Sequence, residues 1–403
     1  MFSRRSAVPH AVDPLFLEIE RARAEHRITY DLTSSNPTNR GLSYPRAAIA
    51  SALADTDPQG YQPEPLGDVR ARRALVELWR GRGVEVSEEQ IVLTASTSEA
   101  YSLLCKLFCD DQSSLLVPAP SYPLFAELLR YENVALESYR LAFDGAWHVD
   151  FDSLERALSP RVKAIVSVSP NNPTGSCCTR DEFERLASYG IPLISDEVFW
   201  AYPVERPTPS LSALSVSNGV AAESSLSAGV KSERARLIVA LDGLSKFAGL
   251  PGIKLGWLTL GGEPGLVREA TRRLEFLCDA YLSVNAPAQK ALPRLLATSE
   301  GVRREICERL QLNLALLDRA LVDAPLSRYP VAAGWSVAVR VPRVCSESEW
   351  VRRLLDNGIL VQPGWFYDFE VDGILVLSLL TEPTIWSSAV EELVRIVTLD
   401  SRG

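Results

Sequence analysis

Short apolar runs alternate with amphipathic stretches through the middle of the chain. The apolar runs are four to eight residues long and rich in Val, Ile and Leu; they occupy residues 91–94, 114–118, 162–169, 191–195, 237–242 and 255–260. Runs of this length and composition are typical of strands buried on both faces. Between them, stretches such as 97–108 and 179–190 carry apolar residues at helical spacing. This alternation predicts an α/β fold whose mostly parallel central sheet is flanked by helices.

The pattern changes towards the C-terminus. Strand-like runs at 335–341, 359–362 and 373–380 alternate with helical stretches, the last of them at 384–397. This pattern predicts a second, smaller α+β domain. We expect residues 45–295 to form the large domain. The N-terminal arm (1–44) and the C-terminal segment (296–403) are expected to form the small domain together.

One segment of the large domain has a different composition. Residues 217–236 are rich in Ser, Ala and Gly and contain few apolar residues. This composition indicates a long surface loop.

Composition narrows the function classes. Hydrophobic residues make up 46% of the 403 and charged residues 23%, which is typical of a globular protein. The 42 basic and 51 acidic residues give a net charge of −9, and no basic cluster lies along a predicted helix. This balance argues against nucleic acid or an anionic membrane as a partner. No segment is apolar over the roughly 18 residues of a membrane span, and the N-terminus lacks the apolar core of a signal peptide, so we expect a cytoplasmic protein.

Cysteine and histidine give no sign of a metal site. The chain has seven scattered cysteines and three histidines. In a cytoplasmic protein this pattern indicates reduced thiols. We expect no metal.

Four polar clusters each follow a predicted strand directly. They are TASTSEA (94–100), SPNNPTG (169–175), the pair Asp196 and Glu197, and GLSK (243–246). In open parallel sheets, ligands bind outside the carboxyl ends of the strands. We therefore expect the four clusters to meet at one crevice.

Each polar cluster admits a functional and a purely structural interpretation. Ser96, Thr97 and Ser98 lie at a helix start, where free backbone N–H groups suit a phosphate, but Ser96 with Glu99 also matches a capping box. The Asn-rich segment that contains Asn172 is either a simple turn or a source of amide donors to a ligand.

The single residues are ambiguous in the same way. Asp196 is either a helix cap or a buried functional carboxylate, and Tyr122 is either a core residue or a platform for a ring. Lys246 lies among small and apolar residues, which suit an amine nucleophile in a dry pocket. It is otherwise an ordinary loop lysine.

The chain carries four motifs in this order: NNPTG, SDEV, SK, and GLPG followed by a basic residue. With these motifs it resembles the class I/II aminotransferases of the fold type I pyridoxal-phosphate family. The resemblance extends from the SSNPT segment near the start to Ser378. It implies a transfer of an amino group from an amino acid to a 2-oxo acid, with pyridoxal 5'-phosphate as cofactor. It also implies a symmetric homodimer with shared active sites.

The resemblance assigns roles residue by residue. Lys246 would carry the cofactor as a Schiff base, and Asp196 would pair with the pyridine nitrogen. Asn172 would donate to the 3'-oxygen of the cofactor and Tyr122 would stack on its ring. The phosphate would be held by residues from several segments, namely Ser96, Thr97, Ser98, Ser245, Lys254 and, from the neighbouring subunit, Tyr61.

Several positions depart from the family pattern. The family commonly has arginine at Lys254, which can pair bidentately with phosphate, and a lysine loses that fork. A serine three residues before Lys246 and a tyrosine three residues after Asp196 are replaced by Gly243 and Phe199.

The departure that affects the substrate is at Val376, where relatives place the arginine that binds the substrate carboxylate. Asn36 and Asn172 are expected to line the substrate side. Arg40 is a candidate replacement for the missing arginine, although it is equally consistent with an exposed residue at the domain boundary.

Two competing functions remain open from the sequence. The missing arginine also suits a pyridoxal-phosphate-dependent lyase, a cyclase or an amine transaminase, because one cofactor site serves many reactions. A non-catalytic sensor module is a further alternative. The presence of both Lys246 and Asp196 and the expected lack of an attached DNA-binding domain argue against it.

Overall fold

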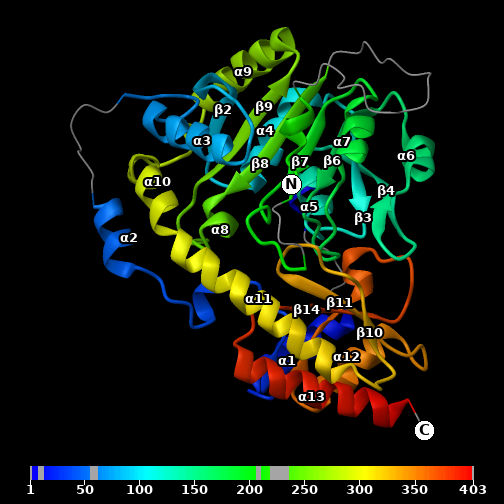
Figure 1. Ribbon diagram of the computed structural model, residues 1–403. Coiled ribbons are helices and arrows are strands. Elements are labelled where there is room, and N and C mark those ends of the chain that lie inside the picture. Colours follow the sequence, from blue (N-terminus) through cyan, green and yellow to red (C-terminus); the bar gives the residue numbers. More distant parts are fainter. Residues whose placement is uncertain (1, 8–12, 55–61, 206–209, 218–235, 402–403) are drawn as a thin grey trace.

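The computed structural model describes the chain except residues 1, 8–12, 55–61, 206–209, 218–235 and 402–403. Its centre is an eight-stranded sheet (Figure 1). In spatial order the strands are β2 (Ile91–Thr94), β9 (Gly256–Gly262), β8 (Leu237–Gly243), β7 (Leu193–Asp196), β6 (Val162–Val168), β3 (Ser114–Ala119), β4 (Ala135–Phe143) and β5 (Trp147–Val149). The five strands from β8 to β4 are parallel neighbours, whereas β2, β9 and β5 pair antiparallel. The predicted mostly parallel sheet is therefore confirmed.

Helices cover both faces of this sheet, as the apolar runs predict. Along β6, Ile165 packs on one face and Val166 on the other. The Ile165 face is covered mainly by α3 (Val69–Gly81), α6 (Phe151–Ala157), α7 (Arg180–Ala187) and α10 (Ala286–Thr298). The Val166 face is covered by α4 (Thr97–Phe108), α5 (Phe125–Tyr131) and α9 (Pro264–Asp279). The polar clusters that follow β2, β6, β7 and β8 therefore begin where strands with two buried faces end.

A second, smaller sheet lies below the first in Figure 1. Its antiparallel strands are β10 (Ser327–Arg328), β11 (Ser336–Arg340), β14 (Ile374–Ser378) and β13 (Gln362–Pro363), in that order. A two-stranded parallel sheet joins β1 (Tyr30–Asp31) of the N-terminal arm to β12 (Ile359–Leu360). The arm and the C-terminal segment thus share one α+β unit. The division at residues 44/45 and 295/296 stays a prediction.

The helices of the smaller unit are α1 (Pro14–Ala24), α11 (Glu300–Ala320), α12 (Glu347–Asp356) and α13 (Pro383–Asp400), and α2 (Arg46–Leu53) packs on α10. Short 3₁₀ turns occupy Arg4–Ser6, Pro37–Asn39, Glu88–Gln90, Ala213–Val216 and Gly364–Tyr367. Helix α11 contacts both units. It packs along α13, and its residues Val302 and Ile306 face Gly249, just after α8 (Leu244–Phe247).

Three further expectations concern composition. None of the described helices is long and apolar enough to cross a membrane. All seven cysteines are free, and no group of three or more potential metal ligands occurs among the described residues. The expected surface loop at 217–236 lies almost wholly outside the described residues.

Candidate active site

Lys246 lies at the end of a buried strand, in partly apolar surroundings. Strand β8 ends at Gly243 and leads directly into the short helix α8, which carries Lys246. The Lys246 Nζ lies 5.0 Å from the ring centre of Trp335 and 5.8 Å from that of Phe199. Burial lowers the pKa of Lys246 to about 8, and the charge of Asp196 partly opposes this shift. The amine is therefore closer to its neutral, nucleophilic form than a surface lysine.

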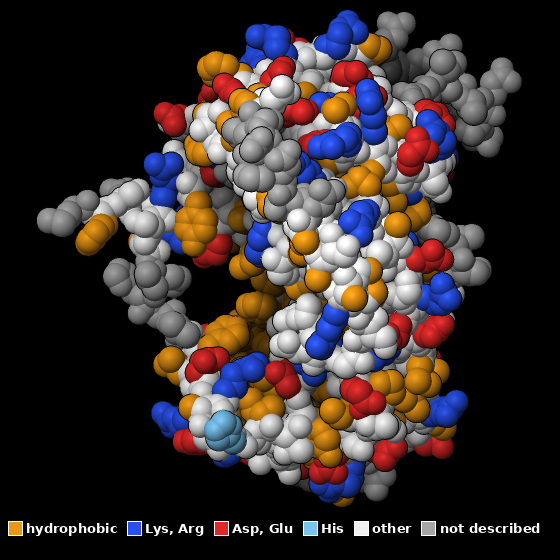
Figure 2. Space-filling model, turned by 90° about the vertical axis from the view of Figure 1, so that its left-hand side faces the viewer, with side chains coloured by type: hydrophobic (Ala, Val, Ile, Leu, Met, Phe, Trp, Pro, Cys, Tyr) orange, Lys and Arg blue, Asp and Glu red, His pale blue; other side chains and the backbone are white. Residues whose placement is uncertain are grey.

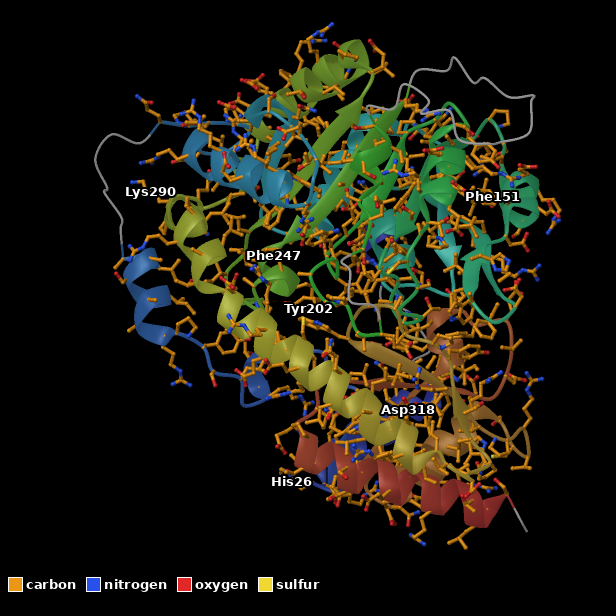
Figure 3. All side chains as sticks on the ribbon, in the orientation of Figure 1. His26, Phe151, Tyr202, Phe247, Lys290 and Asp318 are labelled. Carbon is orange, nitrogen blue, oxygen red and sulfur yellow. The ribbon has the colours of Figure 1, made fainter. Side chains whose placement is uncertain are left out.

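The backbone of Lys246 is also held. The Tyr202 hydroxyl donates to the Lys246 carbonyl at 2.6 Å and to the Phe247 carbonyl at 3.2 Å. Figure 3 shows Tyr202 and Phe247 next to each other near the centre of the molecule. These bonds fix the short helix from the side of the smaller unit.

Asp196 ends the neighbouring parallel strand, where it pairs in register with Leu241. Its side chain is 7% exposed. The Tyr101 hydroxyl donates to Oδ2 at 3.1 Å, and the Val198 amide donates to Oδ1 at 3.3 Å. Burial raises the pKa of Asp196 to about 6, while these hydrogen bonds and Lys246 lower it. A cation beside the carboxylate would therefore favour its charged form strongly.

Aromatic residues line the approach to Asp196. Tyr122 is partly buried, and its ring packs edge-on against Phe125, which packs in turn against Tyr101. Burial and the charge of Asp196 raise the pKa of Tyr122, so the two side chains lie within electrostatic reach. Sequence reasoning identified Tyr122 but missed Tyr101. In the sequence, Tyr101 is one more apolar position on an amphipathic helix.

The start of helix α4 presents free backbone donors. The Ser96 hydroxyl accepts from the Glu99 amide at 3.1 Å, so Ser96 caps the helix. The Glu99 carboxylate accepts from the Ala95 amide and not from that of Ser96, so the reciprocal bond of a capping box is not formed. The amides of Thr97 and Ser98 have no acceptor among the described residues. An added Cβ at Gly256 would lie 3.1 Å from the Thr97 nitrogen, so only glycine lets β9 approach this helix start so closely. Sequence reasoning did not identify Gly256.

The structure separates the roles of the two asparagines after β6. Asn171 is buried and is fully used in binding Ser121, Pro120 and Thr174. Asn172 is partly exposed, and its Oδ1 accepts from the Ser336 hydroxyl at 3.2 Å. Since Ser336 follows Trp335, Asn172 and Lys246 lie against the same end of β11. The Asn172 amide NH₂ has no acceptor in the part of the chain that is described.

The other predicted site residues lie differently. Ser245 is partly exposed next to Lys246, whereas Lys254 is exposed and makes no hydrogen bond or ion pair with any described residue. Asn36 is exposed, and its Oδ1 accepts from the amide and hydroxyl of Thr38. Tyr61 lies outside the described residues.

Arg40 is the residue that the sequence suggested as a replacement for the missing arginine. Its side chain is partly buried, and Nη2 lies 3.5 Å from the Asp31 carbonyl. Its Nε is buried and has no partner among the described residues. Arg40 forms no ion pair with a described carboxylate, so its charge is available to an anion.

Val376 lies in an apolar face of the smaller sheet. It is 1% exposed, pairs in register with Ala338 and Gln362, and packs in a cluster with Tyr329 and Tyr367. No charged group can be accommodated there without a large desolvation cost.

The residues present fit pyridoxal phosphate. The partly buried amine of Lys246, just beyond β8, and the buried carboxylate of Asp196, at the end of the adjacent β7, interact electrostatically, and the carboxylate has a raised pKa that a pyridinium would lower. A helix start with two unused amides suits the phosphate. Asn172 and Tyr122 supply an amide donor and an aromatic ring.

Comparison with known proteins identifies the family of the chain. The family model "Aminotransferase class I and II" matches residues 29–384. The glutamate-pyruvate aminotransferase AlaA of Escherichia coli is 24% identical over 303 residues, which cover 72% of this chain and 68% of AlaA. The tyrosine aminotransferase of Caenorhabditis elegans is 25% identical over 303 residues, covering 72% of this chain and 59% of that enzyme. The structure of an alanine aminotransferase from Pyrococcus furiosus superimposes with a TM-score of 0.84 at 22% identity, covering 98% of this chain and 99% of that one.

The expected architecture and family are thus confirmed, including the fold type I arrangement and the pyridoxal-phosphate cofactor. The match spans both units of the structure and contains Asn172, Asp196, Lys246 and Lys254. The chain therefore belongs to the class I and II aminotransferase family, and it is a pyridoxal-phosphate-dependent aminotransferase.

Proposed function

We propose that Lys246 binds the cofactor covalently and that Asp196 keeps the pyridine nitrogen of the cofactor protonated. Bound pyridoxal phosphate supplies an electron sink for the substrate carbon that bears the amino group. Lys246 Nζ, once free, is the general base and acid that moves the proton at that carbon. The observation that carries this proposal is the electrostatic interaction of Lys246, on the helix that directly follows β8, with Asp196 at the end of the adjacent strand β7.

The remaining roles follow from what each side chain offers. Asn172 donates its free amide NH₂ to the 3'-oxygen and Tyr122 covers the ring. The amides of Thr97 and Ser98 bind the phosphate, to which the hydroxyls of Ser96 and Ser245 can add donors. Lys254 is exposed and supplies charge without the fixed geometry of an arginine.

Replacing Lys246 tests the covalent role. We expect Lys246→Ala to lose the borohydride-fixable cofactor label and at least about 10³-fold of the transamination rate, because both the attachment point and the base are removed. Mass spectrometry of the reduced protein measures the label. Lys163→Ala is the matched control, because Lys163 lies at the opposite end of the sheet on β6 and binds the Pro160 carbonyl. A label that persists in Lys246→Ala would refute the assignment.

The raised pKa of Asp196 gives a second test, on the cofactor-free protein. The folded protein keeps this proton up to about pH 6, whereas a free aspartate loses it near 3.8. The folded state therefore binds more protons in this window, and the stability from this group falls as pH rises through it. Between about pH 4 and pH 7 we expect wild type to lose on the order of 3 kcal/mol of unfolding free energy relative to Asp196→Asn.

Urea unfolding at each pH measures this difference. Saturating cofactor should shrink it, because a pyridinium beside Asp196 stabilises the carboxylate. If cofactor leaves the difference unchanged, Asp196 does not face the pyridine nitrogen.

We propose Arg40 as the residue that binds the carboxylate of the amino acid substrate. Its side chain has an unused, buried Nε and no carboxylate partner among the described residues, while the face around Val376 is apolar. The substrates of the family are amino acids and 2-oxo acids, so a cation is needed near the substrate.

Arg40→Ala is expected to raise KM for amino acid donors about tenfold or more, since a charge-assisted pair is lost. Arg46→Ala, an exposed arginine on α2, is the matched control. Steady-state kinetics with a panel of donors measures the effect. An unchanged KM would reject Arg40, and activity on amines that lack a carboxylate would then favour an amine transaminase.

We also propose a homodimer with shared active sites. Phe276 near the end of α9 and Tyr281 just after it are 82% and 65% exposed. A cavity of about 200 Å³ is lined by Leu93 and by parts of residues 62–70 and 278–290. The face turned to the viewer in Figure 2 is hollowed, and hydrophobic side chains line the hollow. A second copy of the chain would cover such apolar surface.

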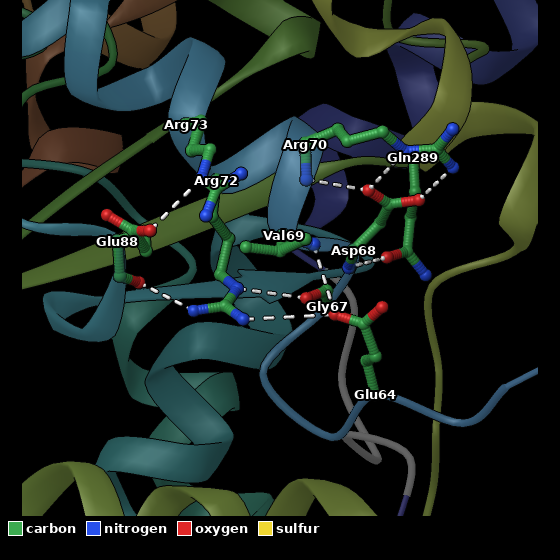
Figure 4. A network of polar contacts seen from close by, with 9 residues as sticks. All are labelled: Glu64, Gly67, Asp68, Val69, Arg70, Arg72, Arg73, Glu88 and Gln289. Carbon is green, nitrogen blue, oxygen red and sulfur yellow. Dashed lines mark hydrogen bonds and ion pairs between the residues drawn. The ribbon is translucent and has the colours of Figure 1, made fainter.

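The segment that follows Tyr61 is firmly anchored. The Asp68 amide donates to Gln289 of α10 at 2.6 Å, and Arg72 donates to the carbonyls of Gly67 and Glu88 (Figure 4). Glu64 accepts from the Val69 amide at 3.0 Å. This network fixes the base of the segment from which Tyr61 would reach the phosphate bound by the partner.

Subunit mixing tests the shared site. We expect Tyr61→Ala and Lys246→Ala each to be nearly inactive alone. Mixed and reassembled, they should recover about a quarter of wild-type activity, because half of the random dimers contain one intact site. No recovery in a mixture shown to contain mixed dimers by mass spectrometry would place Tyr61 in its own subunit's site, and a fully active Tyr61→Ala variant would place it outside any site.

A further inference from the structure

A buried arginine connects the two segments that carry Lys246 and Asp196. Arg82 follows α3, and its side chain is 1% exposed. Its guanidinium lies 4.7 Å from the ring centre of Trp79, 4.3 Å from that of Trp200 and 5.6 Å from that of Phe247. Trp200 lies four residues after Asp196, and Phe247 is adjacent to Lys246. The Arg82 side chain, just after α3, therefore packs against both the segment of Lys246 and the segment of Asp196.

Arg82 is also ion-paired in the interior. Its Nη2 lies 2.5 Å from Oδ2 of Asp242, whose side chain is likewise 1% exposed. The other oxygen of Asp242 accepts from the Gly243 amide at 2.7 Å. Asp242 is the last side chain of β8 before the turn into α8. The pair thus holds the backbone that positions Lys246, four residues further on.

The charge of Asp242 affects the pKa of Asp196. Burial and the Asp242 carboxylate both raise the pKa of Asp196, and Lys246 lowers it. Arg82 and Arg303 lower the pKa of Asp242 against the effect of burial. Arg303 lies on α11, and its guanidinium is 4.3 Å from the ring centre of Phe247. Asp242 is therefore a buried anion whose effect on Asp196 depends on its partner.

A third buried carboxylate, that of Glu197, also lies within electrostatic reach of Arg82. Glu197 is buried, and its Oε1 accepts from the Ser212 hydroxyl at 3.0 Å and from the Ala213 amide at 2.9 Å. Its Oε2 has no partner among the described residues, and neither do Nε and Nη1 of Arg82. Burial raises the pKa of Glu197 to about 7, and the charge of Arg82 opposes this. Arg82 is thus the cation shared by the carboxylates behind the site.

We infer that the buried Arg82–Asp242 ion pair holds α8 in place and balances the charge behind Lys246 and Asp196, which makes Arg82 a positioning residue for the reaction. A buried ion pair is no better for stability than two well-packed neutral side chains, because desolvation offsets the attraction. Packing alone therefore does not require this pair. The inference rests on the proposed roles of Lys246 and Asp196.

Neutral replacements of similar size separate a charge effect from a packing effect. In Asp242→Asn, Arg82 stays charged without its partner, and the added positive potential opposes protonation at Lys246. We expect the pH midpoint of the visible cofactor band to fall by about one unit. In Arg82→Met the uncompensated carboxylate should move the midpoint upward. In the double variant Arg82→Met/Asp242→Asn the midpoint should return to within about 0.3 unit of wild type, since no net charge is changed.

Absorption titration of the cofactor-loaded proteins measures these midpoints without reference to turnover. Asp150→Asn is the matched control, because it breaks the Arg140 ion pair at the far edge of the sheet. It should leave the midpoint unchanged. If Arg82 and Asp242 had a purely structural role, the single variants would lose stability without shifting their midpoints in opposite directions. An unchanged midpoint in Asp242→Asn would overturn the inference.

The double variant keeps the test open if a single variant fails to fold, because replacing both partners removes the unpaired buried charge. A double-variant midpoint displaced as far as one unit would also contradict charge balance. Failure of the proposed role of Lys246 would look different. The cofactor band would then persist in Lys246→Ala, whatever the variants at 82 and 242 show.

Discussion

Desolvation of two opposite charges is the constraint on which this structure depends. Asp196 ends strand β7, Lys246 lies on the short helix that follows the adjacent parallel strand β8, and burial pushes each side chain towards its neutral form. The charges of Lys246 and Asp196 affect each other's pKa, but the two side chains form no ion pair within 4 Å. Each charge is therefore only partly neutralised by the other. The protein therefore presents an amine that can act as a nucleophile and a carboxylate that gains from a cationic ligand. In the proposed roles, a cofactor ring bound covalently to the amine and positively charged beside the carboxylate would stabilise both groups.

The sheet and the polar clusters at its edge could be predicted from the sequence, because each is a local pattern. The apolar runs match strands, and each polar cluster lies where a strand ends. The same reasoning could not choose between Asn171 and Asn172, since only the contacts of Asn171 with Ser121 and Thr174 show that its amide is fully used.

What the sequence could not reveal depends on contacts between distant segments. Tyr101 donates to Asp196 across 95 positions, and Trp335 reaches Lys246 from the smaller unit. Arg82 lies in the sequence Arg-Gly-Arg-Gly, which locally indicates an exposed turn, yet it is among the most buried charged side chains described. Lys254 shows the reverse. Its place in the motif suggested a bound phosphate, whereas its side chain is exposed.

Helix α11 has a mechanical consequence for the site. Its 21 residues correspond to a rod of roughly 30 Å. One end packs along α13, and Val302 and Ile306 near the other end lie beside Gly249, whose amide donates to the Lys246 carbonyl. Helix α11 therefore connects the packing of the C-terminal unit to the backbone next to the amine. The place of that amine is set by residues from both units of the structure.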